Sequence, residues 1–219
     1  MLISIIIPVR DEEQIIKKTL CEFTNKLSKH FLDFEIIVVD DGSTDSTEQR
    51  VEEIIRKDSR IRYLYNNAPH GFGFAIRKGL EFYKGDVVVI AMADGSDEPR
   101  DVVRYCKMIK KGYDCVFGSR FIRNSKVDNY PWFKLVLNRL ANIVVQILFG
   151  IKNNDITNAF KCYRREVIEG VKPILSHHFN LTVELPLKAI VRGYSYVTIP
   201  INWYGRKTGI AKFKIKEMG

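Results

Sequence analysis

Short apolar runs alternate along the chain with longer stretches in which apolar residues recur at helical spacing. Continuous apolar runs bounded by turn residues are typical of buried parallel strands. Such runs cover residues 3–9, 36–39, 61–65, 87–91 and 114–117. Residues 12–29 predict a helix, because Ile15, Ile16, Phe23 and Leu27 share one side. The alternation predicts an α/β fold with a mostly parallel central sheet flanked by helices.

Two of the predicted strands end in carboxylates. Asp40 and Asp41 directly follow one strand, and Asp94 follows another. Ligands of open α/β sheets bind beyond the carboxyl ends of the strands, so these residues predict a binding site at one sheet edge. Asp45 stands three residues before Glu48, as in a capping box, and predicts a helix start. A polar turn without a binding role is the alternative, because Asp and Ser favour turns in general.

The composition favours one domain spanning residues 1–219. The chain is 46% hydrophobic, and no Gly-, Ser- or Pro-rich linker, repeat or low-complexity tract divides it. The apolar run at 3–9 has no basic leader or small-residue cleavage site, which favours a strand over a signal peptide. Four scattered cysteines without a C-x-x-C pair predict neither a disulfide framework nor a zinc site, and fit a reduced, cytoplasmic setting.

The charge balance favours an anionic partner. The net charge is +9, from 35 Lys and Arg against 26 Asp and Glu. Charge alone does not choose among nucleic acid, phosphate and a lipid surface. We expect no nucleic-acid binding, because the basic residues accompany acidic strand ends that would repel a phosphate backbone.

Four segments in a fixed order carry a family resemblance. They are IIIPVRDE at 5–12, VVDDGSTD at 38–45, Ala93-Asp94, and FGSR at 117–120. Together they resemble family-two glycosyltransferases of the GT-A fold, and more narrowly the dolichol-phosphate mannose synthase branch. That branch moves a sugar from a nucleotide diphosphate to a polyprenyl phosphate. The resemblance runs from Pro8 to Lys212, and it implies a nucleotide-sugar-binding half at 1–118 and an acceptor-side half at 119–219.

The resemblance implies a donor site for a GDP- or UDP-linked sugar. Pro8, Arg10 and Glu12 would line the nucleoside pocket, with Arg10 where relatives often have an aromatic residue. Val39 and Asp41 would hold the base and ribose. The other donor-binding residues that it implies are Ala93, Asp94, Arg206 and Lys212.

The implied cofactor is a divalent cation, Mg²⁺ or Mn²⁺. Asp94 matches the second aspartate of the family's Asp-x-Asp metal motif, whereas Met92 replaces the first. A thioether is a poor ligand for these hard ions, which prefer oxygen. Binding would then depend on Asp94, the donor phosphates and water, with Ser96 or Asp97 as further candidate ligands.

A basic segment near the C-terminus is suited to a departing diphosphate. The leaving group gains negative charge as the glycosidic bond breaks, and positioned cations stabilise that charge. Residues 206–212 resemble the family's Arg-x-x-Gly-x-Ser-Lys loop, within a basic stretch at 205–216 and with Ala211 in place of serine. Arg206 and Lys212 match the diphosphate-contacting residues. A solvated basic tail is the alternative interpretation.

Residues 131–150 predict an amphipathic helix. Lys134, Asn138, Asn142 and Gln146 form a narrow polar stripe, and the rest of the surface is broadly apolar. This pattern favours a helix lying in the membrane interface and is too interrupted by polar residues for a comfortable span. The alternative is packing on the protein's own core or on a partner. The resemblance implies that Arg120, Lys134 and Asn138 bind the acceptor phosphate.

The resemblance therefore implies an inverting glycosyltransferase, peripheral at the cytoplasmic face of a membrane, with Asp94, Arg120 and Arg206 as catalytic residues. A phosphate acceptor is already ionised and needs no strong general base. Two alternatives stay open: transfer to a polysaccharide or glycolipid hydroxyl, with Asp155 or Glu184 as base, and a catalytically silent nucleotide-sugar-binding module, which Met92 favours. Asp155 belongs to a segment, 155–161, that is expected to shape the acceptor side. Glu184 is more simply a packing partner, and three histidines are interpreted as structural: His70, His177 and His178.

Overall fold

The computed structural model describes residues 1–30 and 32–205, and its centre is one seven-stranded sheet. The strand order is β3-β2-β1-β4-β7-β5-β8, and β7 runs antiparallel to both of its neighbours. The strands of this sheet are β1 (Ile3–Val9), β2 (Phe34–Asp40), β3 (Ile61–Tyr65), β4 (Val87–Ile90), β5 (Cys115–Ser119), β7 (Lys161–Arg164) and β8 (Tyr196–Pro200). A separate two-stranded parallel sheet joins β6 (Lys126–Asp128) to β9 (Asn202–Tyr204).

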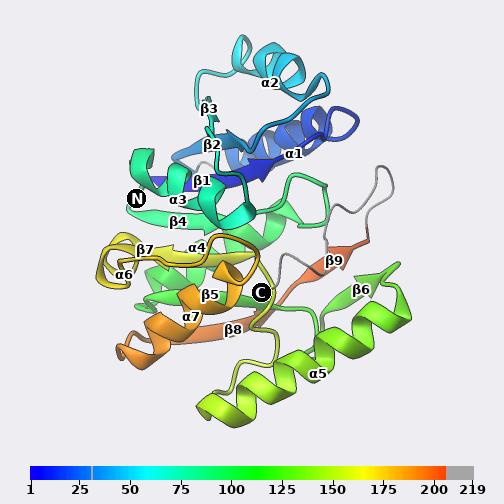
Figure 1. Ribbon diagram of the computed structural model, residues 1–219. Helices are drawn as coiled ribbons and strands as arrows, with labels where there is room; N and C mark the ends of the chain where they lie inside the picture. Colours follow the sequence, from blue (N-terminus) through cyan, green and yellow to red (C-terminus); the bar gives the residue numbers. More distant parts are fainter. Residues whose placement is uncertain (31, 206–219) are drawn as a thin grey trace.

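Helices cover both faces of the large sheet (Figure 1). One face carries α1 (Ile16–Lys29), α2 (Thr47–Ile55) and α4 (Pro99–Lys110), and the other carries α3 (Phe72–Phe82), α6 (Arg165–Gly170) and α7 (Leu181–Val191). Successive strand residues point to opposite faces, so Ile5 and Ile7 enter the first core while Ile6 enters the second. Full burial of one such side chain contributes about 1.5 to 3 kcal/mol.

The predicted α/β architecture is confirmed, and two local expectations are wrong. The first helix begins at Ile16 rather than at Glu12, because residues 12–15 form a turn. The predicted capping box is absent: α2 begins at Thr47 after Ser46, and the Ser46 side chain makes no capping hydrogen bond. Asp45 instead accepts hydrogen bonds from the backbone N–H and hydroxyl of Thr47, at 2.9 and 2.5 Å. Strands on both sides of residue 118 share one sheet, and the division into two halves stays a prediction.

Helix α5 (Trp132–Phe149) lies outside these layers (Figure 1). Its apolar side chains are largely exposed, including Trp132 at 75% and Ile147 at 76%. The alternative of an apolar face packed on the protein's own core is therefore wrong for the described residues. The helix is long and apolar enough to cross a membrane, with a mean hydropathy of 1.4. By length and composition alone, the polar residues of this helix therefore do not exclude a membrane span.

Candidate active site

The carboxyl ends of β1, β2 and β4 meet at one edge of the sheet. Strand β1 pairs in parallel with both neighbours, with Val9 opposite Asp40 and Ile6 opposite Ile90. The Asp41 backbone N–H donates to the Val9 carbonyl at 2.9 Å. The predicted donor-site residues with described positions all lie at or just beyond these strand ends; they are Pro8, Arg10, Glu12, Val39, Asp41, Ala93 and Asp94. The sheet thus gathers residues that are distant in sequence.

The loops that follow β1 and β2 are joined by hydrogen bonds in both directions. Asp11 has a positive φ of 48°, which turns the chain after β1, and its carboxylate accepts from the Thr44 N–H at 2.5 Å. In return, the Ser43 and Thr47 hydroxyl oxygens accept from the N–H groups of Asp11 and Glu12, at 2.9 and 2.8 Å. These reciprocal bonds fix the direction in which the loop after β1 leaves the sheet.

Asp41 is almost fully buried at the rim. One carboxylate oxygen accepts from the Asn66 side-chain amide and the other from the Gly71 backbone N–H, each at 2.8 Å. The His70 ring nitrogen Nδ1 lies 3.5 Å from the first of these oxygens. Val39 has no exposed surface and belongs to the core beneath α3, so its role towards the base stays a prediction. His70 therefore belongs to the rim that surrounds Asp41.

The acidic loop after β4 orients its two aspartates differently. Asp94 is partly exposed and accepts from the Ser96 N–H at 3.1 Å. Asp97 is 4% exposed, and its Oδ2 accepts from the Met92 N–H at 2.9 Å. Burial raises the pKa of Asp97 to about 7, with nearby Asp94 acting in the same direction. Of the two, Asp94 is the carboxylate that remains accessible from the strand-end edge.

Within residues 1–30 and 32–205, no group of three or more His, Cys, Asp or Glu side chains is placed to hold a metal ion. The candidate ligand Ser96 is 1% exposed, and its carbonyl accepts from the Tyr204 N–H at 3.1 Å. Ala93 is likewise buried, with its carbonyl bonded to the Thr19 hydroxyl at 2.9 Å. The described protein groups thus fit a divalent cation only as a single-carboxylate site, which other oxygen ligands would have to complete.

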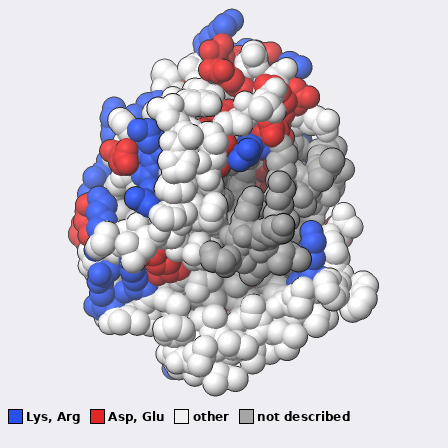
Figure 2. Space-filling view, viewed as in Figure 1, with Lys and Arg blue, Asp and Glu red and all other residues white. Residues whose placement is uncertain are grey.

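Acidic side chains dominate the visible surface near this edge. Figure 2 shows Asp and Glu gathered around α2 and the nearby loops, whereas many Lys and Arg lie along the opposite side, beside α3 and α6. An anionic diphosphate approaching the acidic strand ends needs a cation to offset repulsion. The overall charge of +9 does not by itself supply that cation at the described rim.

Arg120 lies on the other side of the site, directly after β5. Its Nε and Nη2 donate to the Asp155 carboxylate at 2.8 and 2.7 Å, and its backbone N–H donates to the same group at 2.9 Å. The guanidinium also lies over the rings of Phe121, Tyr130 and Trp203, at 5.2, 5.6 and 5.8 Å. Burial opposes its charge, yet the hydrogen bonds with Asp155 and the negative charge of that carboxylate together outweigh burial and raise the pKa of Arg120.

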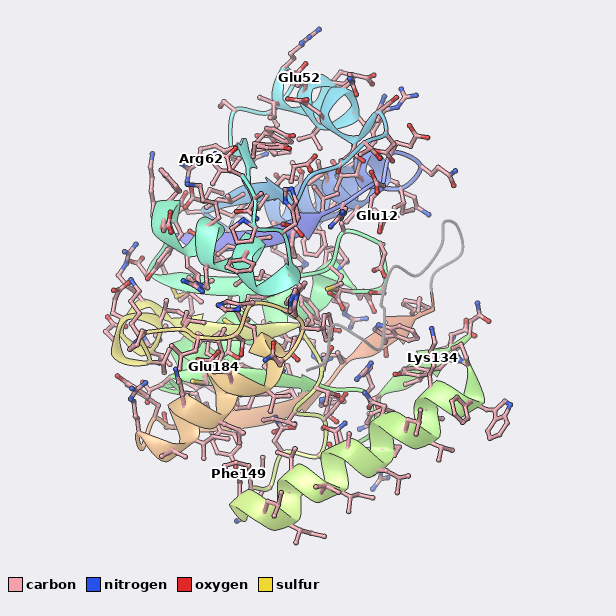
Figure 3. All side chains as sticks on the ribbon, in the orientation of Figure 1. Glu12, Glu52, Arg62, Lys134, Phe149 and Glu184 are labelled. Atoms are coloured by element: carbon pink, nitrogen blue, oxygen red, sulfur yellow. The ribbon has the colours of Figure 1, made fainter. Side chains whose placement is uncertain are left out.

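The two other predicted acceptor residues lie on α5. Lys134 is exposed near the start of the helix, and Phe149 lies at its far end (Figure 3). The Asn138 side chain donates to the Thr157 hydroxyl at 2.8 Å, so its amide is already bound to the protein body. Arg206 and Lys212 lie outside the described residues, as does the segment 206–216 of the predicted basic loop. The individual roles of all these residues stay predictions.

Comparison with known proteins identifies the family. A model described as "Glycosyl transferase family 2" matches residues 4–171. The chain belongs to glycosyl transferase family 2. The family resemblance drawn from the sequence is thereby confirmed, and the chain is a glycosyltransferase.

Two similar members of the family have names that specify a lipid acceptor. Polyprenol monophosphomannose synthase of Mycolicibacterium smegmatis is 33% identical over 84% of this chain and 76% of its own length. Dolichol-phosphate mannosyltransferase of Pyrococcus furiosus is 30% identical over 100% of this chain and 61% of its own length. The chain thus spans less than two thirds of the Pyrococcus protein.

Solved structures share the fold of this family 2 member. Glucosyl-3-phosphoglycerate synthase from Mycobacterium tuberculosis, in complex with Mn²⁺, UDP and phosphoglyceric acid, has a TM-score of 0.71 and 18% identity. That match covers 99% of this chain and 72% of the other. A structure described only as a mycobacterial protein gives 0.73 and 20%, over 99% and 70% of the two chains. The predicted GT-A fold is confirmed.

The structure also shows roles that the sequence did not reveal in this glycosyltransferase. Lys161, in β7, is fully buried, and its Nζ donates to the carbonyls of Ile156 and Thr182 at 2.8 and 3.2 Å and also to the Asn158 carbonyl. Burial lowers the pKa of Lys161 to about 7. A lysine between the apolar residues Phe160 and Cys162 is a sequence signal of a buried structural lysine. The same lysine interrupts the apolar pattern, so the sequence does not predict β7.

Glu184, His177 and His178, which the sequence analysis interprets as structural, all pack against other parts of the protein. Glu184 accepts from the backbone N–H groups of Leu175 and Ser176, at 2.8 and 2.7 Å, and pairs with Lys188 at 2.5 Å. Burial opposes ionisation of Glu184, but the bonds from Lys188 and Ser176 lower its pKa to about 2. His177 stacks on Phe74 with ring centroids 4.5 Å apart. His178 lies against Gly71, where an added Cβ would approach its ring within 2.7 Å.

Proposed function

We propose that this glycosyltransferase moves a sugar from a nucleoside diphosphate to a polyprenyl phosphate with inversion at the anomeric carbon. The observation that carries the proposal is similarity to two proteins named for polyprenol and dolichol-phosphate mannosyl transfer, at 33% and 30% identity. In a single displacement the acceptor phosphate oxygen attacks the anomeric carbon, the glycosidic bond breaks, and the nucleoside diphosphate leaves with the electron pair. One displacement inverts the configuration.

The donor half of the proposal uses the edge formed by β1, β2 and β4. Asp41, fixed by Asn66 and Gly71, would bind the ribose through the outer side of its carboxylate. Arg10 is exposed beyond β1, where its cation can approach the nucleotide. We further propose that Arg206 and Lys212 stabilise the departing diphosphate, because preorganised cations act most strongly where charge develops.

A divalent cation would be held by Asp94 together with the donor's own phosphates. The structural neighbour from M. tuberculosis is described in complex with Mn²⁺ and UDP, which supports the same class of cofactor here. When bound, such an ion supplies Lewis-acid stabilisation of the diphosphate. The protein's part is to present Asp94 from the loop after β4, while Asp97 holds that loop through the Met92 N–H.

The geometry of Asp155 favours a phosphate acceptor over a hydroxyl acceptor. A hydroxyl acceptor would need a general base within hydrogen-bond reach. Asp155 has no exposed surface, and both of its oxygens accept hydrogen bonds from the Arg120 side chain. Glu184 is similarly engaged by Lys188 and two backbone N–H groups. Neither candidate base is available in this arrangement, whereas an ionised phosphate needs none.

We propose that the enzyme acts at the cytoplasmic face of a membrane, and helix α5 supports the peripheral attachment. Exposed Trp132, Phe133 and Leu137 lie beside Lys134 near the helix start, a combination suited to the headgroup region. The middle of the helix is bound to the protein through Asn142, which favours a helix lying along the interface over one that crosses the bilayer. Lys134 would then stand beside Arg120 in acceptor-phosphate binding.

A donor screen tests the proposal. The protein is incubated with radiolabelled GDP- and UDP-linked sugars and with polyprenyl phosphate in detergent, and organic extracts are assayed for lipid-linked sugar. We expect acid-labile lipid product from one donor and a large loss of it in Arg120→Lys, which keeps a cation beside Asp155 but not the planar guanidinium. Transfer only to a water-soluble hydroxyl acceptor would overturn the acceptor assignment. Binding of a donor without any transfer, in the presence of Mg²⁺ or Mn²⁺, would instead support a silent binding module, which the Met92 substitution favours.

A further inference from the structure

A polar seam of hydrogen bonds joins helix α5 to the rest of the protein. In the described part of the chain, Asn142 is the one α5 residue that is buried. Its Nδ2 donates to the Thr157 hydroxyl at 3.0 Å, and its Oδ1 accepts from the Thr157 backbone N–H at 3.3 Å. One turn earlier, Asn138 donates to the same hydroxyl at 2.8 Å. Thr157 is therefore where two successive turns of α5 meet the body.

The segment that carries Thr157 also holds the end of β5. Two residues before Thr157, Asp155 fixes the Arg120 guanidinium. On either side, Asn154 accepts from the Ser119 hydroxyl at 2.7 Å, and Asn158 donates to the Gly118 carbonyl at 3.0 Å. Within the segment 153–158, residues that contact α5 thus lie next to residues that contact the end of β5 and Arg120.

This segment is held as one unit from inside the protein. The buried Nζ of Lys161 donates to the carbonyls of Ile156 and Asn158, which flank Thr157. Arg139 of α5 adds a bond from Nη1 to the Asn154 carbonyl at 3.1 Å. These bonds hold the backbone at both neighbours of Thr157, so Thr157 and Asp155 belong to one short segment that is fixed from inside the protein.

We propose that Asn142 and Thr157 are positioning residues for sugar transfer: the seating of α5 on the segment 153–158 sets the orientation of Arg120. The inference rests on the proposed function for the assignment of Arg120 to the acceptor phosphate. Neither residue needs to touch the substrate. Misplacing a reacting group by about 1 Å can reduce the rate by about a hundredfold, so a distant contact that fixes Arg120 has a measurable kinetic effect.

Matched variants separate positioning from general stability. Thr157→Val removes the hydroxyl and keeps the shape, Thr157→Ser keeps the hydroxyl, and Asn142→Leu removes the same contact from the helix side. Gln146→Leu, one turn further along the polar stripe, is the control. We expect Thr157→Val and Asn142→Leu to raise the KM for polyprenyl phosphate about tenfold with the donor KM unchanged, and Thr157→Ser and Gln146→Leu to resemble the wild type.

A measurement that needs no acceptor makes the inference independent of the proposed function. The ¹⁵N resonance of the Arg120 Nε–H reports its bond to Asp155 directly. We expect it to move in Thr157→Val and in Asn142→Leu, and to stay in place in Thr157→Ser and Gln146→Leu. An unmoved resonance in both of the first two variants overturns the inference. A moved resonance in a protein that makes no lipid-linked sugar supports the positioning link and overturns the proposed acceptor instead.

Discussion

The Asp155 carboxylate accepts two parallel hydrogen bonds from the Arg120 guanidinium, from Nε at 2.8 Å and from Nη2 at 2.7 Å. Both side chains are nearly sealed from water, at 7% exposure for Arg120 and 0% for Asp155. A bidentate pair of this kind fixes the plane of the guanidinium as well as its place. Its remaining N–H groups are consequently held in a defined direction.

Removing one partner of this pair should destabilise the fold strongly. We expect Asp155→Asn to lower the free energy of unfolding by about 3 to 5 kcal/mol, because it leaves a buried guanidinium without its counter-charge. The control is Asp58→Asn: Asp58 binds Arg60 with the same two-bond geometry, but Arg60 is 42% exposed. The control should lose less than about 1 kcal/mol. Urea denaturation measures both values, and equal losses would contradict a water-excluded pair.

The second prediction concerns the metal. We expect Asp94→Ala to abolish donor turnover and to weaken Mn²⁺ binding in the presence of the nucleoside diphosphate, because Asp94 is the accessible carboxylate of the loop after β4. Met92→Asp should preserve or raise the Mn²⁺ affinity, since it supplies a second oxygen ligand. Titration calorimetry with Mn²⁺ measures these affinities.

Asp86→Ala is the matched control for the metal prediction. Asp86 immediately precedes β4, at the end of the strand opposite to Asp94, and its side chain is 66% exposed. This variant should leave Mn²⁺ binding unchanged. If Asp94→Ala keeps near wild-type activity in every metal condition, or if a chelator has no effect on the wild type, Asp94 is not a metal ligand.

The strand ends and the family motifs were predictable from local sequence, whereas the contacts across the acceptor side were not. Apolar runs located β1, β2 and β4, and the structure brings the carboxylates that follow β2 and β4 to one edge of the sheet. Strand β7 was missed because Lys161 interrupts its apolar pattern, and only the fold shows which carbonyls bind that lysine. The polar stripe of α5 was visible, but whether Asn142 faces water or the protein depends on residues far away in sequence.

Lys161 leads to a prediction about pH and stability. Its pKa is about 7 in the fold, lowered by burial from an ordinary value of 10.5. Between these values the unfolded chain binds the proton and the native protein does not, so stability should rise with pH, by about 2 kcal/mol from pH 7 to pH 9. Lys161→Met should be less stable overall, since three carbonyls lose their donor, and should lack this rise.

Urea unfolding of both proteins at pH 7 and at pH 9 gives the test. The difference between wild type and Lys161→Met cancels the titration of the tyrosines and cysteines that the two share. Parallel pH profiles would mean that Lys161 keeps its proton in the fold throughout this range, held by the carbonyls, and would contradict the prediction.

The last prediction separates apolar and electrostatic attachment of α5 to a membrane. Trp132 and Phe133 are 75% and 57% exposed, and burial of their rings contributes about 25 cal/mol per Å² that does not fade with salt. Cationic contacts with an anionic leaflet contribute about 1 kcal/mol each and do fade. Trp132→Glu with Phe133→Glu should therefore release the protein from phosphatidylglycerol vesicles even at low salt, as measured by co-sedimentation. Arg120→Lys, which keeps a cation beside Asp155, should still sediment with the vesicles and yet form little lipid-linked sugar, because the Arg120 side chain is only 7% exposed and does not contribute to the apolar surface of α5. Wild-type protein that stays in solution at low salt would show that the exposed face of α5 does not bind lipid.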